Sequence, residues 1–171
     1  RVEHGGQVSY NQFSPKGIFN SWSVRLNGNY NQLYEPNTFT NMFVNLNLNG
    51  QFRNFWSLSG EIGGNPRTDN DFFEARTSGY VFRRPESQRY SVSLRTDGRK
   101  LLSGNGRYRV SVRPEWDFVE HSYNVSGTIR IGQRAEVSHR IEVLDRKNNR
   151  GYVTKLYDDA GTLTDVMFGV R

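Results

Sequence analysis

The chain has 171 residues, no cysteine, and 23 Lys and Arg against 17 Asp and Glu, which gives a formal net charge of +6. The missing cysteines exclude a disulfide framework and a thiolate zinc site, and no apolar run approaches the roughly 18 residues of a membrane-spanning helix. Aromatic residues make up 13% of the chain, which is too many for an intrinsically disordered protein. Basic residues are dispersed, with no run longer than pairs such as Arg83-Arg84, so we expect no nucleic-acid partner.

The clearest predicted element covers residues 18–34. From Ile18 to Tyr34 the even positions are mostly apolar or aromatic, while the odd positions from Ser21 to Asn31 are Ser, Arg and Asn. Alternation with a period of two is typical of a β-strand, because successive side chains point to opposite faces of a sheet. This segment is therefore predicted to form one long strand with an apolar face and a polar face.

The same period of two recurs along the rest of the chain. In chain order it is found at residues 42–53, 56–63, 90–95, 107–113, 123–131 and 136–143. The phase of the alternation changes around Glu120 to Ser122. No stretch has the 3.6-residue period of an amphipathic helix, so the sequence predicts an all-β chain.

The length of the predicted strands favours a membrane barrel. Strands of globular proteins average about 5–6 residues, whereas strands that cross a bilayer need about 9–11. The polar phase holds the strand arginines Arg25, Arg95, Arg109 and Arg130. A barrel requires this placement, because arginine at the lipid midplane costs roughly 2–4 kcal/mol. A soluble sheet with one solvated face predicts the same pattern less strictly, so it stays open as an alternative.

Aromatic residues gather toward the ends of the apolar stripes. The members of this group are Trp22, Tyr30, Tyr34, Trp56 and Trp116. Amphipathic rings at these positions are typical of the girdles that outer-membrane barrels place at the lipid headgroups. The alternative role is a stacking platform for sugars, but the apolar phase of the tryptophans favours anchoring at the lipid interface.

The connections are predicted to alternate between short turns on one side and longer loops on the other. The short turns are residues 14–17, 53–54 and 85–88, and the longer loops are residues 64–72 and 97–106. Because outer-membrane barrels have short periplasmic turns and longer external loops, we expect the two longer loops outside the cell. The connection at Gly132-Gln133-Arg134 is shorter than this scheme predicts.

Several short segments resemble one uncharacterised family. They are Asn54-Phe55-Trp56-Ser57-Leu58, Thr96-Asp97-Gly98-Arg99-Lys100 and Asn148-Asn149-Arg150-Gly151-Tyr152-Val153. In this order they resemble the Bacteroidetes outer-membrane β-barrel domain that follows a family-9-type carbohydrate-binding module. The resemblance implies a barrel in the outer membrane of a Gram-negative cell and carries over no catalytic residue. The 171 residues contain no such module, and the last of them, 169–171, lack the usual terminal aromatic, so we expect a barrel segment that misses strands at one or both ends.

Arginines on the polar phase are the sharpest functional candidates. The predicted lumen-lining residues are Arg25, Arg95, Arg107, Arg109, Arg113 and Arg130, together with Glu61. One hypothesis is a lumen that selects anions or binds sugars and phosphates, since the guanidinium group holds oxyanions. The other, which we favour, is a lattice of salt bridges with Glu61, Glu136 and Glu142 that fills a narrow interior.

No catalytic or metal-binding motif stands out. Asp69 and Asp71 are weak calcium candidates, since calcium prefers oxygen ligands but needs six or more of them. Ser138 and His139 suggest a hydrolase pair, but neighbouring strand residues point to opposite faces. We expect no cofactor, and an enzymatic function is uncertain and not favoured.

Residues 1–171 are thus predicted to be one segment of an antiparallel up-and-down transmembrane β-barrel with about ten to eleven strands. The expected location is the outer membrane, and the expected function is a scaffold or pore linked to glycan binding or uptake at the cell surface. Its expected partners are membrane lipid and, as further candidates, a glycan or another outer-membrane protein. The alternatives are a soluble extracellular sandwich or jelly roll that binds carbohydrate, and a hydrolase embedded in a barrel.

Overall fold

The computed structural model describes residues 1–132 and 135–170 as an all-β fold. Eight strands form one sheet in the order β1-β2-β3-β4-β7-β8-β9-β10, and all neighbours are antiparallel. These strands are β1 (Val2–Gln12), β2 (Phe19–Leu33), β3 (Thr38–Phe52), β4 (Ser57–Asn65), β7 (Ser87–Arg95), β8 (Leu102–Arg113), β9 (Phe118–Ile131) and β10 (Ala135–Lys147). The prediction of antiparallel β structure is confirmed.

Two small ribbons and one short helical turn complete the described part of the chain. β5 (Asp69–Asp71) pairs with β6 (Phe82–Arg84), and β11 (Arg150–Tyr157) pairs with β12 (Leu163–Val170). A 3₁₀ helix, Pro114–Trp116, joins β8 to β9. Within the described ranges there is no helix long and apolar enough to cross a membrane.

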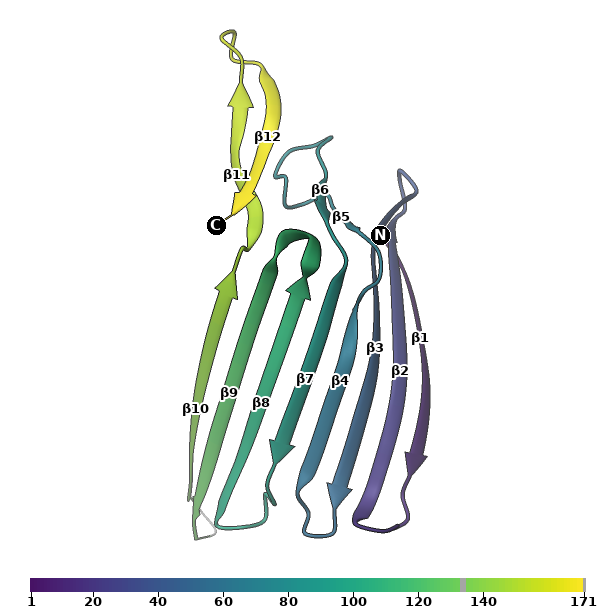
Figure 1. Cartoon of the computed structure of the whole chain (residues 1–171), viewed down its shortest axis with the longest axis vertical. Helices are drawn as coiled ribbons and strands as arrows, with labels where there is room; N and C mark the ends of the chain where they lie inside the picture. Colours follow the sequence, from purple (N-terminus) through teal and green to yellow (C-terminus); the bar gives the residue numbers. More distant parts are fainter. Residues whose placement is uncertain (133–134, 171) are drawn as a thin grey trace.

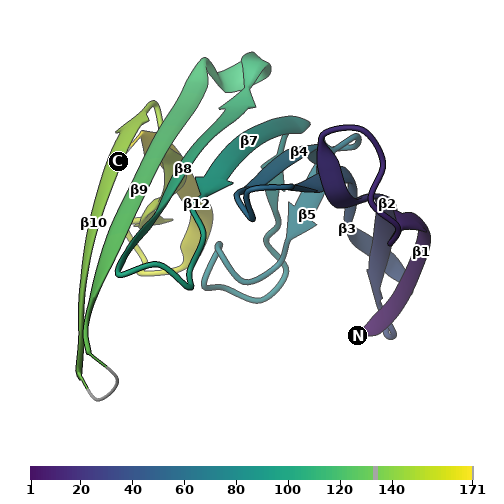
Figure 2. The same cartoon turned by 90° about the horizontal axis from the view of Figure 1, so that it is seen from below.

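The sheet is curved and open. Each strand neighbours the next along the chain except at β4 and β7, which flank the β5–β6 insertion. Figure 2 shows the strands as an arch, with β5 and β12 on its concave side. The two edges, β1 and β10, do not pair with each other, so the described residues form a curved wall and not a closed barrel.

The pairing register sorts side chains onto two faces of opposite character. One lateral row joins Leu26, Leu46 and Ile62, and the next joins Arg25, Asn47 and Glu61. We call the first face the apolar face and the second the polar face. The polar face lies on the concave side, because Asn65, on the polar face of β4, donates its side-chain amide to Asp69 of β5, and β5 lies within the arch.

Burial on the two faces is the reverse of that in a soluble protein. On the apolar face, Ile62 is 54% and Val125 is 59% exposed, although both lie within strands that are paired on both sides. Alternate polar residues of β4, such as Ser59 and Glu61, are only partly exposed. A globular sheet buries its apolar face against a second layer, but the described residues provide no such layer.

The expected phase change within one strand is wrong. β9 runs from Phe118 to Ile131 without a register shift, so no change of phase occurs around Glu120 to Ser122. The register places His121 on the apolar face between Val119 and Tyr123, where its ring Nδ1 lies within hydrogen-bonding distance of the Tyr108 hydroxyl.

The predicted sidedness of the connections is also wrong in part. The turns at residues 13–18, 53–56 and 96–101 share the lower end of the sheet in Figure 1, and residues 66–86 lie at the upper end. Asp97 is therefore at the opposite end from Asp69. The insertion is one long connection from β4 to β7, so Pro85 belongs to it and not to a lower turn. Gln133 and Arg134 of the predicted turn at 132–134 lie outside the described residues.

A small apolar core lies at the upper end. Its buried residues are Ala75, Phe82, Phe118 and Val166, contributed by the insertion, β9 and β12. The Phe82 ring stacks on Phe168 with centroids 4.6 Å apart and packs against Trp116 at 5.5 Å. Trp116 thus lies in the 3₁₀ turn, and its predicted place in an apolar strand stripe is wrong, because Pro114 interrupts the alternation after β8.

Phe82 should hold this upper core together. We expect Phe82→Ala to lower the free energy of unfolding by about 3 kcal/mol or more, because it removes a ring that is 4% exposed. Phe73→Ala is the control: its ring, in the same insertion, is 82% exposed, and the expected change is within about 0.5 kcal/mol. Urea denaturation measures both, and equal effects would show that the Phe82 cluster does not stabilise the fold.

Candidate functional site

The polar face is the largest candidate site in the described structure. The register places all seven predicted lumen residues on this face. One row runs across five strands as Arg25, Asn47, Glu61, Ser91 and Arg109. The strands thus collect charged side chains that are far apart in the sequence on one concave surface.

Amide side chains form a ladder over the first strands of this face. The Asn27 amide donates to Asn45 Oδ1 at 2.9 Å, and the Asn45 amide donates to Glu61 Oε1 at 3.4 Å. Higher on the same strands, the Asn31 amide donates to Asn41 Oδ1 at 2.6 Å. Asn is normally depleted in strands, and here two Asn pairs that lie directly opposite each other on β2 and β3, Asn27 with Asn45 and Asn31 with Asn41, bond through their amides.

The salt-bridge lattice that we favoured is present at only one of its expected places. Arg130 Nε lies 3.3 Å from Glu136 Oε2. Among the described residues, Glu61 and Glu142 form no ion pair within 4.0 Å, and neither do the other five predicted lumen arginines. The Nε atoms of Arg109 and Arg113 are buried without a hydrogen-bond partner. The middle of the polar face is therefore positively charged.

The predicted interface aromatics divide between the two ends of the sheet. Trp22 packs against Tyr10 at 5.3 Å on the apolar face near the lower end, and Trp56 precedes β4 at the same end. Tyr30 packs against Phe39 at 5.4 Å near the upper end, where Tyr34 follows β2. Whether these rings contact lipid stays a prediction.

The sequence pattern did not predict a cluster of aromatic side chains on the apolar face. The Tyr108 hydroxyl lies 2.8 Å from His121 Nδ1, and the Tyr108 ring lies 5.0 Å from the Tyr123 ring. Asp145 is opposite His121 in the register of β9 and β10. These residues are distant in the sequence, so strand pairing alone reveals them.

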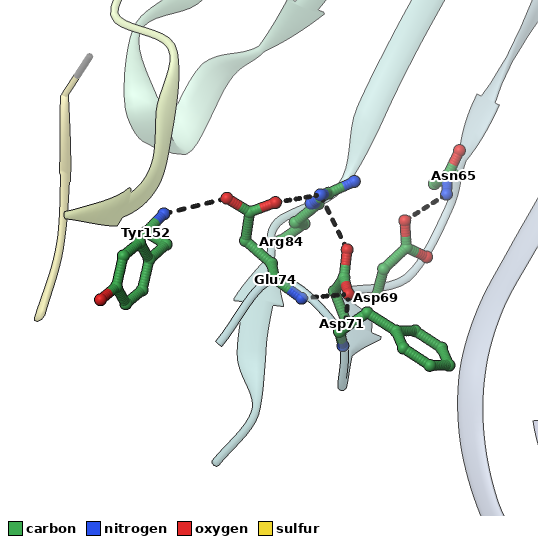
Figure 3. A network of polar contacts seen from close by, with 7 residues as sticks. Asn65, Asp69, Asp71, Glu74, Arg84 and Tyr152 are labelled. Atoms are coloured by element: carbon green, nitrogen blue, oxygen red, sulfur yellow. Dashed lines mark hydrogen bonds and ion pairs between the residues drawn. The ribbon is translucent and has the colours of Figure 1, made fainter. Parts of the chain in front are cut away.

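A network of polar contacts anchors the insertion to the last ribbon (Figure 3). Arg84 binds Asp71 at 2.7 Å and Glu74 at 3.6 Å, and the backbone N–H of Tyr152 donates to Glu74 at 3.0 Å. Asp71 Oδ1 also accepts bonds from the backbone N–H groups of Phe73 and Glu74, both at 2.9 Å. The Asp71 and Glu74 carboxylates therefore brace the insertion, and Glu74 links it to β11.

The calcium prediction for Asp69 and Asp71 receives no support. Asp71 is bound to Arg84, and Asp69 accepts a hydrogen bond from the Asn65 amide. Within the described ranges, no group of three or more His, Asp or Glu side chains has the arrangement of a metal site. The hydrolase pair also receives no support. The Ser138 hydroxyl bonds to Thr128 at 3.1 Å on the polar face, whereas His139 lies on the apolar face.

Asp69 has an unusual protonation equilibrium. Burial raises the pKa of its carboxyl from 3.8 to about 6, although bonds from Asn65 and the Met42 backbone and the charges of Arg113 and Arg84 act in the opposite direction. One of its oxygens, Oδ1, is buried without a partner. Protonation of Asp69 therefore relieves a desolvated charge where β5 meets β3.

This shift predicts a pH dependence of stability. Because the pKa of Asp69 is higher in the folded state than the ordinary 3.8, the folded state binds the proton more tightly, and this group makes folding more favourable as the pH falls from 7 to about 5. Asp69→Asn should abolish this contribution to the pH dependence of stability, which thermal unfolding at pH 7 and at pH 5 measures. Asn70→Ser is the control: it breaks the bond to Phe39 without removing a titratable group, so it should lower stability equally at both pH values. An unchanged slope in Asp69→Asn would contradict the assignment.

Comparison with known proteins places the chain in a family. No curated protein and no solved structure matches it. The model of a family described as a domain of unknown function, DUF5916, matches residues 1–171. This match covers the sheet and both ribbons, and the chain belongs to the DUF5916 family.

Proposed function

We propose that this chain forms part of the wall of a transmembrane β-barrel in a bacterial outer membrane. The observation that carries the proposal is the reversed burial of the sheet: apolar side chains such as Val92 (48%) and Ile141 (55%) are exposed, while the polar face lines the concave side. A membrane barrel has this polarity, because lipid covers its outer surface and its interior is polar.

Strand length and charge placement support the same proposal. The strands of the sheet contain between 9 and 15 residues, enough to cross a bilayer at a tilt. Among the described residues, only Asp145 and Lys147 place an ionised Asp, Glu, Lys or Arg side chain on the apolar face, and both lie near the upper end of β10. The middle of the apolar face is free of these charges, as a lipid core requires.

The open edges support closure by further strands. β1 and β10 each have one side without a strand partner, and such edges are removed in a barrel. We infer that additional strands pair with both edges and close the wall around the polar face.

The polar face suggests what the barrel does. Its unpaired arginines on β7 and β8 give the interior a positive potential, and rings of arginine favour anions in pores. We therefore propose a pore or scaffold for anionic or glycan solutes at the cell surface. The resemblance to the Bacteroidetes outer-membrane domain beside a carbohydrate-binding module supports the location and the glycan link. The expected partner of the apolar face is outer-membrane lipid.

A matched pair of substitutions tests the membrane assignment. Leu46→Arg places a charge between Leu26 and Ile62 on the apolar face and should prevent membrane assembly, since it costs roughly 2–4 kcal/mol near the lipid midplane. Asn47→Arg places the same charge between Arg25 and Glu61 on the polar face and should assemble normally. Membrane fractionation and heat-modifiable gel mobility measure both. Equal tolerance, or a monomer that is stable without detergent, would favour a soluble sheet that binds carbohydrate.

Conductance tests the pore. In planar bilayers the full-length protein should favour chloride over potassium, and Arg109→Gln should lower this preference because it removes a charge from the middle of the polar face. Lys147→Gln removes a charge from the apolar face and should leave the preference unchanged. A protein that inserts but does not conduct would have a scaffold role and no open pore.

A further inference from the structure

A polar hollow lies at the lower end of the polar face. It has a volume of about 500 Å³ and lies between the turn at residues 96–101 and the strands from β3 to β10. Its floor includes one lateral row of side chains, which the register gives as Gln51, Ser57, Arg95, Asn105 and Ser126. Except for Phe55, no large apolar side chain lines it.

The two acidic side chains of the hollow are already neutralised. Asp97 accepts two bonds from the Arg99 guanidinium, at 2.9 and 2.8 Å, and a third from the Arg99 backbone N–H at 3.0 Å. These bonds lower the pKa of Asp97 to about 2. Glu136 accepts a bond from Arg130 at 3.3 Å. Each acid is therefore matched by one arginine.

Arg95 remains as the uncompensated charge of the hollow. It forms no ion pair within 4.0 Å among the described residues, and its neighbours in the register are the neutral Ser57 and Asn105. An arginine guanidinium binds carboxylate or phosphate oxygens through a planar pair of donors. The hollow thus offers one oxyanion position.

The rest of the floor offers partners for hydroxyl groups. Within the described structure the side chains of Gln51, Ser103, Asn105 and Ser126 make no hydrogen bond to another protein group. Hydroxyl and amide groups both donate and accept, which suits a ligand with several hydroxyls. The ligand class that matches one guanidinium and a row of neutral hydrogen-bonding groups is a polyol with a single oxyanion.

The wall of the hollow is held in place before any ligand binds. The Arg99 guanidinium lies 3.5 Å from the centre of the Phe55 ring, which links the turn at 96–101 to the turn at 53–56. Thr96 Oγ1 accepts a hydrogen bond from the backbone N–H of Gly104 at 2.8 Å, and the backbone N–H of Arg130 donates to the Leu101 carbonyl at 2.9 Å. A site ordered in this way loses little conformational entropy on binding.

We propose that this hollow is a binding site for a sugar acid or sugar phosphate, with Arg95 holding the oxyanion and the serine and amide groups of the floor holding the hydroxyls. On the proposed function, this site lies at the lower mouth of the barrel interior. Binding in solution does not depend on that function, so the two proposals can fail separately.

The test measures binding of D-glucuronate to the detergent-solubilised full-length protein by ligand-observed NMR. Glucuronate should bind more tightly than glucose, which lacks the carboxylate, and more tightly than acetate, which lacks the hydroxyls. Arg95→Gln should weaken glucuronate binding roughly tenfold or more, as expected for the loss of a charge-assisted bond. Lys16→Gln removes one positive charge from the same end of the sheet, outside the hollow, and should leave the affinity unchanged.

A second variant distinguishes the contribution of the floor side chains to binding from that of the Arg95 charge. Asn105→Ala should weaken glucuronate binding and leave acetate binding unchanged, because it removes a partner of the hydroxyls only. The proposal is overturned if glucose binds as tightly as glucuronate, if Arg95→Gln and Lys16→Gln weaken binding equally, or if no saturable binding occurs up to about 10 mM. If the protein assembles normally in the membrane but does not bind glucuronate, only the ligand-site proposal is refuted, and the membrane proposal stands.

Discussion

The register of the eight-stranded sheet, continuous through the middle of every strand pair, is the constraint on which the rest of the structure depends. Because side chains alternate with a period of two, a slip of one residue in any strand would exchange its two faces. From β4 to β10 the pairings contain no shift, and the irregularities of β2 and β3 lie near strand ends. Leu26, Leu46 and Ile62 therefore stay in one apolar row, and the adjacent row keeps Arg25 beside Asn47 and Glu61. Both the exposed apolar face and the basic concave face follow from this alignment.

The upper end is organised by a different kind of contact. Phe82 and its ring partners bury the only sizeable apolar cluster of the described residues, and Arg84 joins the carboxylates of Asp71 and Glu74 beside it. Aromatic packing supplies stability there, while the ion pairs set how the insertion meets the last ribbon. The lower end lacks such a core, and its turns are joined by the contact of Arg99 with Phe55. The buried apolar core thus lies at the upper end of the sheet, and the polar hollow lined by Arg95 lies at the lower end.

Much of this arrangement could be predicted from residue order, and the failures have identifiable causes. The alternation from Ile18 to Tyr34 predicted β2, and the polar phase of Arg95 and Arg109 predicted their common face. Of the predicted salt-bridge lattice, the described residues form the Arg130–Glu136 pair but none at Glu61 or Glu142, because facing partners depend on register: Ser91 and not a glutamate lies opposite Arg109. Asp97 was placed at the wrong end because a long insertion with its own short strands looks, in the sequence, like a further crossing of the sheet.

By itself the sequence determined that the chain is antiparallel β structure with one apolar and one polar side to each strand, since strand geometry converts alternation directly into two faces. The tertiary structure alone decided which residues meet across strands, because cross-strand neighbours such as Tyr108 and His121, or Arg95 and Asn105, are brought together by pairing register and not by proximity in the chain. It also decided that the polar face is the concave one. That choice rests on the curvature of the whole sheet and on the insertion docked against β3, neither of which any single strand encodes.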